Sequence, residues 1–211
     1  MEHGLPTFKP AASAILPAPA RTTPEKPMAL KATVYKAHLQ IADMDRHHYH
    51  DYHLTLARHP SETDDRLMVR LLAFAVHADP GIQFGKGLSD DDAPDAWLDD
   101  LTGNMLLWIE LGQPDEKRLR KACSRSQRVV VYAYSGHAAD IWWQQLQPKL
   151  SRLHNLEIVC LPTGAAVELG ELAARSMQLQ CTLQEGQLLL TDGQRSVTLD
   201  LAAAKVYPPG H

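Results

Sequence analysis

The chain has 211 residues and a formal net charge of −4 at pH 7, with 45% hydrophobic and 22% charged residues. These values are ordinary for a globular protein, so they exclude a wholly disordered or fibrous chain. They also exclude the strong overall basic charge of a nucleic-acid coat protein, so any contact with nucleic acid must be local.

Cysteine usage and hydropathy indicate the compartment. Cys123, Cys160 and Cys181 lie far apart and form no CxxC pair, which argues against a disulfide framework and a structural zinc site. No segment of the sequence approaches the roughly 18 consecutive apolar residues that a membrane span requires. We therefore expect a cytoplasmic protein without a membrane partner.

The N-terminal segment differs in composition from the rest of the chain. Residues 1–27 contain six prolines and no periodic apolar face, so they cannot bury enough surface to offset the entropy lost on ordering. We expect this segment to be a disordered, proline-rich extension. Met28 opens a new composition that looks like a natural N-terminus, and residues 28–207 are predicted to form a single domain.

The first predicted elements are a hairpin and a helix. Strand-like runs at residues 31–41 and 49–56 flank residues 43–46, a polar segment suited to a turn. Ser61, followed three residues later by an acid, resembles a capping box and predicts a helix start with Ser61 as N-cap. Residues 79–81, Asp-Pro-Gly, should end this helix. Its apolar face is formed by Leu67, Leu71, Phe74, Ala75 and Ala78.

Strands and helices alternate through the middle of the chain. After an acidic loop at residues 89–95, residues 105–111 form a nearly continuous apolar run that Glu110 interrupts once, as in a buried strand. A short helix should follow Pro114, with acids in its first turn and cations later. The next predicted elements are a strand at 129–134, a helix with its apolar positions between 141 and 150, and a strand at 156–161. This alternation indicates a sheet with parallel members.

The last part of the chain alternates polar and apolar residues with the period of two typical of strands. Residues 177–183 and 197–201 show this pattern, and Glu185-Gly186 and Asp192-Gly193 suit two-residue turns. We expect an antiparallel meander here. The predicted fold class is therefore α/β of the mixed α+β kind, a mixed sheet flanked by helices with an N-terminal hairpin and a C-terminal antiparallel meander.

Two long stretches carry a family resemblance. Residues 54–63 read Leu-Thr-Leu-Ala-Arg-His-Pro-Ser-Glu-Thr, and residues 107–118 read Leu-Trp-Ile-Glu-Leu-Gly-Gln-Pro-Asp-Glu-Lys-Arg. A third stretch, residues 139–145, supports them with Ala-Asp-Ile-Trp-Trp-Gln-Gln. From about Met28 to about Leu201 the chain resembles the YaeQ family. The resemblance implies a divergent PD-(D/E)XK core, the fold of restriction endonucleases, with hairpins added.

A PD-(D/E)XK core holds Mg²⁺ with carboxylates from a helix and two strands. By the resemblance, Glu62 and Glu110 match the first and last carboxylate positions. Relatives usually show an acid where Leu106 stands, so Asp95 becomes the substitute third ligand. A lone carboxylate in a buried apolar strand is costly unless it is paired or binds a cation, which singles out Glu110.

The same core uses a lysine to polarise the attacking water or the phosphate. Gly112 stands at the position of that lysine, so the cation would come from Lys121 or Lys117, which lie four residues apart on the following helix. Because the lysine is replaced by Gly112, a protein without catalytic activity is a competing interpretation.

Each of these candidates has a structural alternative. Glu62 can sit in the first helical turn and pair with Arg66. Glu110 can pair with a buried arginine, Arg58 or Arg70. The alternative for Asp95 is a solvated loop, and for Lys117 and Lys121 exposed helix charges.

Further polar and aromatic clusters allow two readings each. Arg58 and His59 precede the exposed N–H groups of a helix start and could bind phosphate, or form a packed corner. Trp142 and Trp143 fit the core and rim of a helix better than a base-stacking platform. A histidine-rich hairpin could hold a metal or be polar surface. Its candidate ligands are His47, His48, His50, Asp51 and His53.

Two functional hypotheses follow. The first is Mg²⁺-dependent hydrolysis of phosphodiesters in nucleic acid through Glu62 and Glu110. The second is a non-catalytic binding module that keeps the nuclease-like fold and a charged cleft. The sequence contains no GxGxxG, Walker or GxSxG motif, so it gives no support for dinucleotide, P-loop or α/β-hydrolase chemistry.

Overall fold

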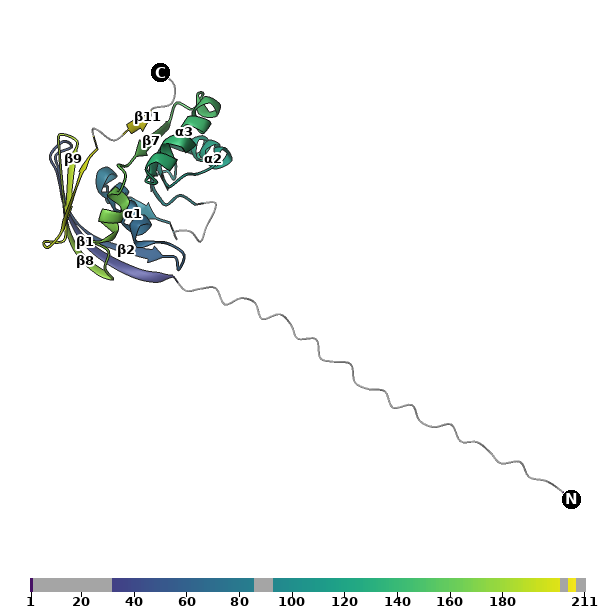
Figure 1. The fold of residues 1–211 in the computed structure, drawn as a ribbon, viewed down its shortest axis with the longest axis horizontal. Coiled ribbons are helices and arrows are strands. Elements are labelled where there is room, and N and C mark those ends of the chain that lie inside the picture. Colours follow the sequence, from purple (N-terminus) through teal and green to yellow (C-terminus); the bar gives the residue numbers. More distant parts are fainter. Residues whose placement is uncertain (2–31, 86–92, 202–204, 208–211) are drawn as a thin grey trace.

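The computed structural model describes residues 1, 32–85, 93–201 and 205–207, the last three by their backbone alone. It contains two mixed sheets, with two helices between them and two more on the outer face of the larger sheet (Figure 1). The predicted mixed α+β class is confirmed. Apart from Met1, the proline-rich extension lies outside the described residues, as do Met28 and residues 89–92 of the acidic loop.

The elements have the following bounds. The helices are α1 (Asp64–His77), α2 (Glu116–Arg125), α3 (His137–Leu150) and α4 (Ala165–Gly170). The strands are β1 (Thr33–Asp43), β2 (His48–Arg58), β3 (Gln83–Phe84), β4 (Ala96–Asp99), β5 (Met105–Leu111), β6 (Ser126–Ala133), β7 (Leu156–Cys160), β8 (Ser176–Gln184), β9 (Gln187–Thr191), β10 (Ser196–Asp200) and β11 (Lys205–Tyr207).

The smaller sheet joins both ends of the domain, in the order β10-β9-β8-β1-β2. The predicted hairpin β1–β2 and the predicted meander β8–β9–β10 are both confirmed. They form one sheet because β1 pairs in parallel with β8, with Lys36 opposite Ser176. Burial alternates along β1 and β8, so each strand has one buried and one exposed face.

The larger sheet has the order β11-β7-β6-β5-β4-β3. Its central strands β5, β6 and β7 are parallel, as predicted, and α2 and α3 are the crossover helices that connect them. The remaining strand pairs of this sheet are antiparallel.

Helix α1 is the centre of the core. Its residues from Leu67 to Ala75 are all buried, because the smaller sheet covers one side and the larger sheet the other. Trp108 and Trp143 belong to a separate apolar cluster with α2 and α3, on the opposite face of the larger sheet. Trp142 is half-buried at its rim, so the prediction of core and rim for the two tryptophans is confirmed.

Several local predictions are wrong. Thr63, not Ser61, is the N-cap of α1, since its side chain accepts a hydrogen bond from the Arg66 N–H. Four residues, 192–195, connect β9 to β10, where the sequence suggested a two-residue turn. The short elements β3, β4 and α4 had no periodic signal long enough to predict them. No helix within the described ranges is long and apolar enough to cross a membrane.

Candidate functional site

The candidate carboxylates come from three separate places in the fold. Glu62 lies in the turn between β2 and α1, Asp95 lies directly before β4, and Glu110 lies in β5. All three side chains are buried. The burial of Asp95 shows that the interpretation of this residue as a solvated loop acid is wrong.

Glu62 is bound by two arginines of α1. Arg66 donates to its Oε1 over 3.3 Å and Arg70 to its Oε2 over 3.2 Å. The His59 backbone N–H also donates to Oε2, over 3.4 Å. The alternative pairing with Arg66 is confirmed, but Glu62 precedes the N-cap Thr63 and so is not in the first helical turn.

Arg66 joins Glu62 to Asp95. Its second terminal nitrogen donates to both oxygens of Asp95, over 2.8 and 3.0 Å. The Leu111 backbone N–H donates to Asp95 Oδ2 over 2.9 Å, which fixes the carboxylate at the end of β5. Burial disfavours the charge on Arg66, but Asp95 and Glu62 together outweigh burial and raise the pKa of this guanidinium.

Glu110 is held separately from this network. Strand alternation places it on the same face of β5 as Trp108, whose indole N–H donates to Oε2 over 2.9 Å. Arg118 of α2 forms an ion pair with Oε1 at 2.8 Å. The sequence suggested Arg58 or Arg70 as the partner, and both suggestions are wrong, because these residues lie on the α1 side of the larger sheet.

The electrostatics of Glu110 are unusual for a paired acid. Burial raises the pKa of Glu110, and the nearby charge of Asp95 adds to the rise. The hydrogen bonds from Arg118 and Trp108 lower it but do not compensate fully. The ionised carboxylate of Glu110 therefore destabilises the folded protein relative to the protonated form.

Arg58 is engaged by the protein itself. Its guanidinium donates to the Glu62 carbonyl oxygen over 2.8 Å and to the Tyr35 hydroxyl over 2.9 Å, and it pairs with Asp64 at 3.4 Å. These contacts favour the packed-corner interpretation of Arg58. Phosphate binding by Arg58 and the half-buried His59 stays a prediction.

Helix α2 carries the predicted catalytic lysines and further cations. Lys117 is exposed and Lys121 half-buried. Arg120 and Arg125 are exposed as well, and the Arg125 guanidinium lies 5.8 Å from the centroid of the Trp108 ring. The whole helix contains a single acid, Glu116, against five cations. It is thus a local basic surface on a chain of net negative charge.

Gly112, at the position where the family resemblance implies a lysine, has a backbone conformation that disfavours any residue with a side chain. Its φ is +89°, a left-handed conformation that residues with a Cβ adopt at a cost. The Gly112 N–H donates to the Tyr132 carbonyl over 2.9 Å, so the conformation is held by the sheet. An added Cβ would meet open space here, since no atom lies within 4 Å of it. Only the backbone disfavours it.

The structure brings Glu62 and Asp95 together through Arg66 and leaves Glu110 apart. Glu62 contacts α1, whereas Glu110 faces the cluster of α2 and α3. Among the described residues there is no group of three or more histidine, cysteine, aspartate or glutamate side chains that could hold a metal ion. The sequence analysis missed Arg118, although its position in the first turn of the helix that follows β5 after a four-residue connection was a usable signal.

The histidine-rich hairpin is confirmed as a hairpin, and His48, His50 and His53 contact other side chains. His53 stacks on His38 with ring centroids 4.5 Å apart and an angle of 7°. His48 shares a hydrogen bond of 2.8 Å with the Tyr52 hydroxyl, and His50 packs against the edge of the same ring. These contacts are typical of a polar surface.

Comparisons with known proteins agree on one family. The family model described as YaeQ protein matches residues 28–201. The uncharacterized protein YaeQ of Salmonella typhi is 48% identical over 83% of this chain and 97% of its own length, and that of Escherichia coli K12 is 46% identical over the same shares.

Solved structures agree with the sequence matches. The crystal structure of the YaeQ protein from Xanthomonas axonopodis pv. citri has a TM-score of 0.79 and 49% identity, covering 84% of this chain and 98% of that one. The YaeQ protein from Pseudomonas syringae has a TM-score of 0.76 and 33% identity, covering 85% and 97%.

Proposed function

Since this chain belongs to the YaeQ family, we propose that it is a non-catalytic binding module that contacts nucleic acid through the basic surface of α2. One observation carries the non-catalytic part. Each of the three candidate carboxylates, Glu62, Asp95 and Glu110, accepts from an arginine. A site prepared for Mg²⁺ offers several oxygen ligands to the ion, whereas here the guanidinium groups take that place.

Displacing the arginines would be costly. Arg70 is fully buried, and burial lowers its pKa while the charge of Glu62 acts in the opposite direction. A metal ion that took Glu62 would leave Arg70 as a buried charge without its partner, which costs several kcal/mol. The closed network is therefore better suited to holding β2, α1 and β4 together than to binding an ion.

The nucleic-acid part rests on α2. Lys117, Arg120 and Arg125 project to solvent from a helix with one acid, and such a surface attracts phosphates while the rest of the chain repels them. Arg120 pairs with Glu116 at 2.8 Å, so Lys117 and Arg125 are the better candidates for phosphate contacts.

The test is the salt dependence of binding. Fluorescence anisotropy with labelled 20-nucleotide single-stranded DNA, the same RNA and a DNA duplex should show binding that weakens with salt. Lys117→Gln and Arg125→Gln should each reduce the slope of log K against log salt by about 1. Arg195→Gln is the matched control, since Arg195 is an exposed arginine in the connection between β9 and β10, away from α2. Absence of salt-dependent binding, or equal slopes in all three variants, would contradict the proposal.

A second function has one observation in its favour. A single guanidinium, that of Arg66, holds Glu62 with one terminal nitrogen and Asp95 with the other. A cation that replaced this group would find both carboxylates within reach. This supports the Glu62 and Asp95 part of the Mg²⁺-dependent phosphodiester hydrolysis that the sequence suggested. Glu110 and the assisting Lys121 or Lys117 lie on the α2 side of the larger sheet, apart from this pair.

Calorimetry separates the two functions. The hydrolytic proposal requires saturable binding of Mg²⁺ or Mn²⁺ by the whole chain, abolished by Asp95→Asn, and turnover of a labelled DNA and RNA panel that the same variant loses. Thr102→Ala in the exposed β4–β5 loop is the control for preparation-dependent nuclease contamination. If the parent and Asp95→Asn turn over the substrates equally, the activity comes from a contaminant. That result would contradict the hydrolytic proposal.

A further inference from the structure

The outer face of the smaller sheet is polar and uncovered. Residues of β1 and β8 that point away from α1 are exposed or half-buried, and within the described part of the chain no helix packs on them. In register across the sheet, His38 lies beside His53 and Gln178, and Gln40 lies beside Asp51 and Gln180. This face is distinct from α2 and from the arginine–carboxylate network.

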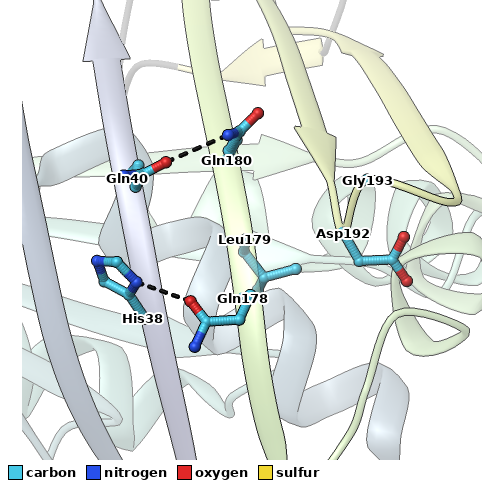
Figure 2. Close-up of a pocket in the computed structure, with 7 residues that line it drawn as sticks. All are labelled: His38, Gln40, Gln178, Leu179, Gln180, Asp192 and Gly193. Atoms are coloured by element: carbon cyan, nitrogen blue, oxygen red, sulfur yellow. Dashed lines mark hydrogen bonds between the residues drawn. The ribbon is translucent and has the colours of Figure 1, made fainter.

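A groove with a volume of about 260 Å³ lies on this face. Figure 2 shows its lining, with two residues from β1, neighbouring residues from β8 and the start of the β9–β10 connection. The lining residues are His38, Gln40, Gln178, Leu179, Gln180, Asp192 and Gly193. The groove exists because β9 ends at Thr191, opposite Gln180, so the part of β8 before Gln180 has no neighbour on that side.

Two hydrogen bonds orient the amides of the groove (Figure 2). The Gln178 Oε1 is 2.7 Å from His38 Nδ1, and the Gln180 amide nitrogen donates to Gln40 Oε1 over 3.2 Å. The first bond occupies the oxygen of Gln178 and leaves its NH₂ group as a donor. The second leaves the oxygen of Gln180 as an acceptor and the NH₂ group of Gln40 as a donor. Donors and acceptors thus alternate along the two strands.

Asp192 adds a fixed acceptor. Its Oδ1 accepts from the backbone N–H groups of Gln194 and Arg195, over 2.8 and 2.7 Å, and its Oδ2 accepts from the Arg195 guanidinium over 3.3 Å. The Arg195 backbone bond, with the others, lowers the pKa of Asp192, so the carboxylate stays ionised at neutral pH. Each carboxylate oxygen has further lone-pair capacity for a ligand.

We propose that this groove binds a neutral, polyhydroxylated ligand, an oligosaccharide. A hydroxyl group both donates and accepts, so a run of hydroxyls matches an alternation of amide donors and oxygen acceptors. The lining of this groove contains no lysine or arginine, and the charge of Asp192 is paired with Arg195 at 3.3 Å, so the groove offers no positive side chain to a phosphate or an acidic sugar. A nucleic acid therefore fits α2 and not this groove.

A second groove extends the first along β1. It shares His38 and Gln178 with the first groove, and its lining also includes Thr55, Ser176 and Lys36. Thr55 and Ser176 add hydroxyl groups. Two adjoining grooves with His38 and Gln178 in common suit a chain of several sugar units better than a monosaccharide.

The experiment is saturation-transfer difference NMR on the full chain with maltotriose, cellotriose, chitotriose and mannotriose, followed by calorimetry with any that bind. We expect saturable binding of at least one, weakened tenfold or more by Gln178→Leu and by Gln40→Leu. Both residues are exposed, so neither change should impair folding. Thr198→Val, on the exposed face of β10 and outside both grooves, is the matched control and should leave the affinity unchanged.

A third variant tests the orientation of the amide. His38→Phe keeps a ring against His53 but releases Gln178, so it should weaken binding while thermal stability is kept. Binding of none of the four sugars, or equal binding by Gln178→Leu, would overturn the proposal. So would a dimer in sedimentation velocity that Gln178→Leu dissociates, because a second copy of the chain would then occupy this face.

Discussion

Arg70 and Glu62 form an ion pair of 3.2 Å in which neither side chain is exposed to solvent. Arg70 also donates to the carbonyl oxygens of Ala57 and Gly85, so one buried cation links α1 to β2 and to the end of β3. The pair therefore holds the two sheets to the central helix.

Loss of this pair should be the most destabilising change at the site. Glu62→Gln leaves Arg70 buried without a counter-charge, and we expect a loss of about 3–5 kcal/mol in the free energy of unfolding. Urea denaturation at pH 7 measures it. The control Asp64→Asn removes an exposed partner of Arg58 and should cost below about 1 kcal/mol. Equal effects of the two changes would show that Glu62 is dispensable for the fold.

Glu110→Gln should behave differently, although Glu110 is also paired with an arginine. Burial raises the pKa of Glu110 in the folded protein, so the folded state holds the proton more tightly than the unfolded chain does. Stability is then lost as pH rises through the ordinary carboxyl range and above it. Glutamine lacks this charge and still accepts from Trp108, so we expect a stability within about 1 kcal/mol of the parent at pH 7.

Denaturation of Glu110→Gln at pH 4.5 and at pH 7 provides the check, because the variant should lose the pH dependence that Glu110 confers. A loss of about 3–5 kcal/mol at pH 7 would mean that the ion pair with the partly exposed Arg118 outweighs the cost of burial. The same variant in calorimetry with Mn²⁺ then shows whether the carboxylate has any part in metal binding.

His77 should make the protein sensitive to acid. Its ring shares a hydrogen bond of 2.9 Å with the Tyr132 hydroxyl, and burial lowers the pKa of His77 from 6.5 to about 3. Between these values the unfolded chain takes up a proton that the folded protein does not, so stability falls as pH falls below about 6.5. The contribution is up to about 2 kcal/mol between pH 7 and pH 5.

His77→Gln removes this titration and still offers an acceptor to Tyr132, so the loss of stability between pH 7 and pH 5 should shrink. Guanidinium unfolding curves at both pH values measure it. His50→Gln, at an exposed position of β2, is measured in parallel as the control for removing a surface histidine. If the parent loses no more stability in acid than His77→Gln does, then His77 is protonated in the folded state.

Gly112→Ala tests the backbone at the end of β5. With φ at +89° and open space around an added Cβ, the cost should be that of the left-handed conformation alone, about 1–2 kcal/mol. Gln113→Ala, at the exposed neighbour, should change stability by less than about 0.5 kcal/mol. If Gly112→Ala leaves the free energy of unfolding unchanged, the turn after β5 must relax to a conformation that alanine adopts without cost.

The sequence predictions succeeded for features formed by residues close together in the chain and failed for contacts between residues far apart. The strands and long helices follow from periodicities within ten to fifteen residues, and the pairing of Glu62 with Arg66 follows from their spacing of four on the chain. The pairing of Asp95 with Arg66 joins residues 29 apart through the meeting of a helix and a sheet edge. No local pattern indicates such a contact.

The same reasoning explains what was missed in the fold. The four-residue strand β4 is too short to show alternation, and the parallel pair β1–β8 could not be inferred because nothing in either strand specifies its partner. The hairpin and the meander were therefore predicted as separate additions to one mixed sheet, whereas they form a second sheet together. The proposed partner of Glu110 failed for a related reason, since strand alternation gives a face but does not say which arginine lies there.

The pairing of β1 with β8 also bears on how the chain is made. His38 and Gln178, which meet across this pair, are separated by 140 residues. Because the ribosome synthesises the chain from its N-terminus, β1 and β2 emerge long before β8 is made. Until then the apolar face of the hairpin and the edge of β1 that pairs with β8 stay exposed to solvent. Closing so long a loop is slow, because its entropy is lost before the strand pair forms. Nascent chains of this protein are thus expected to depend on a holding chaperone until β8, at residues 176–184, has left the ribosome.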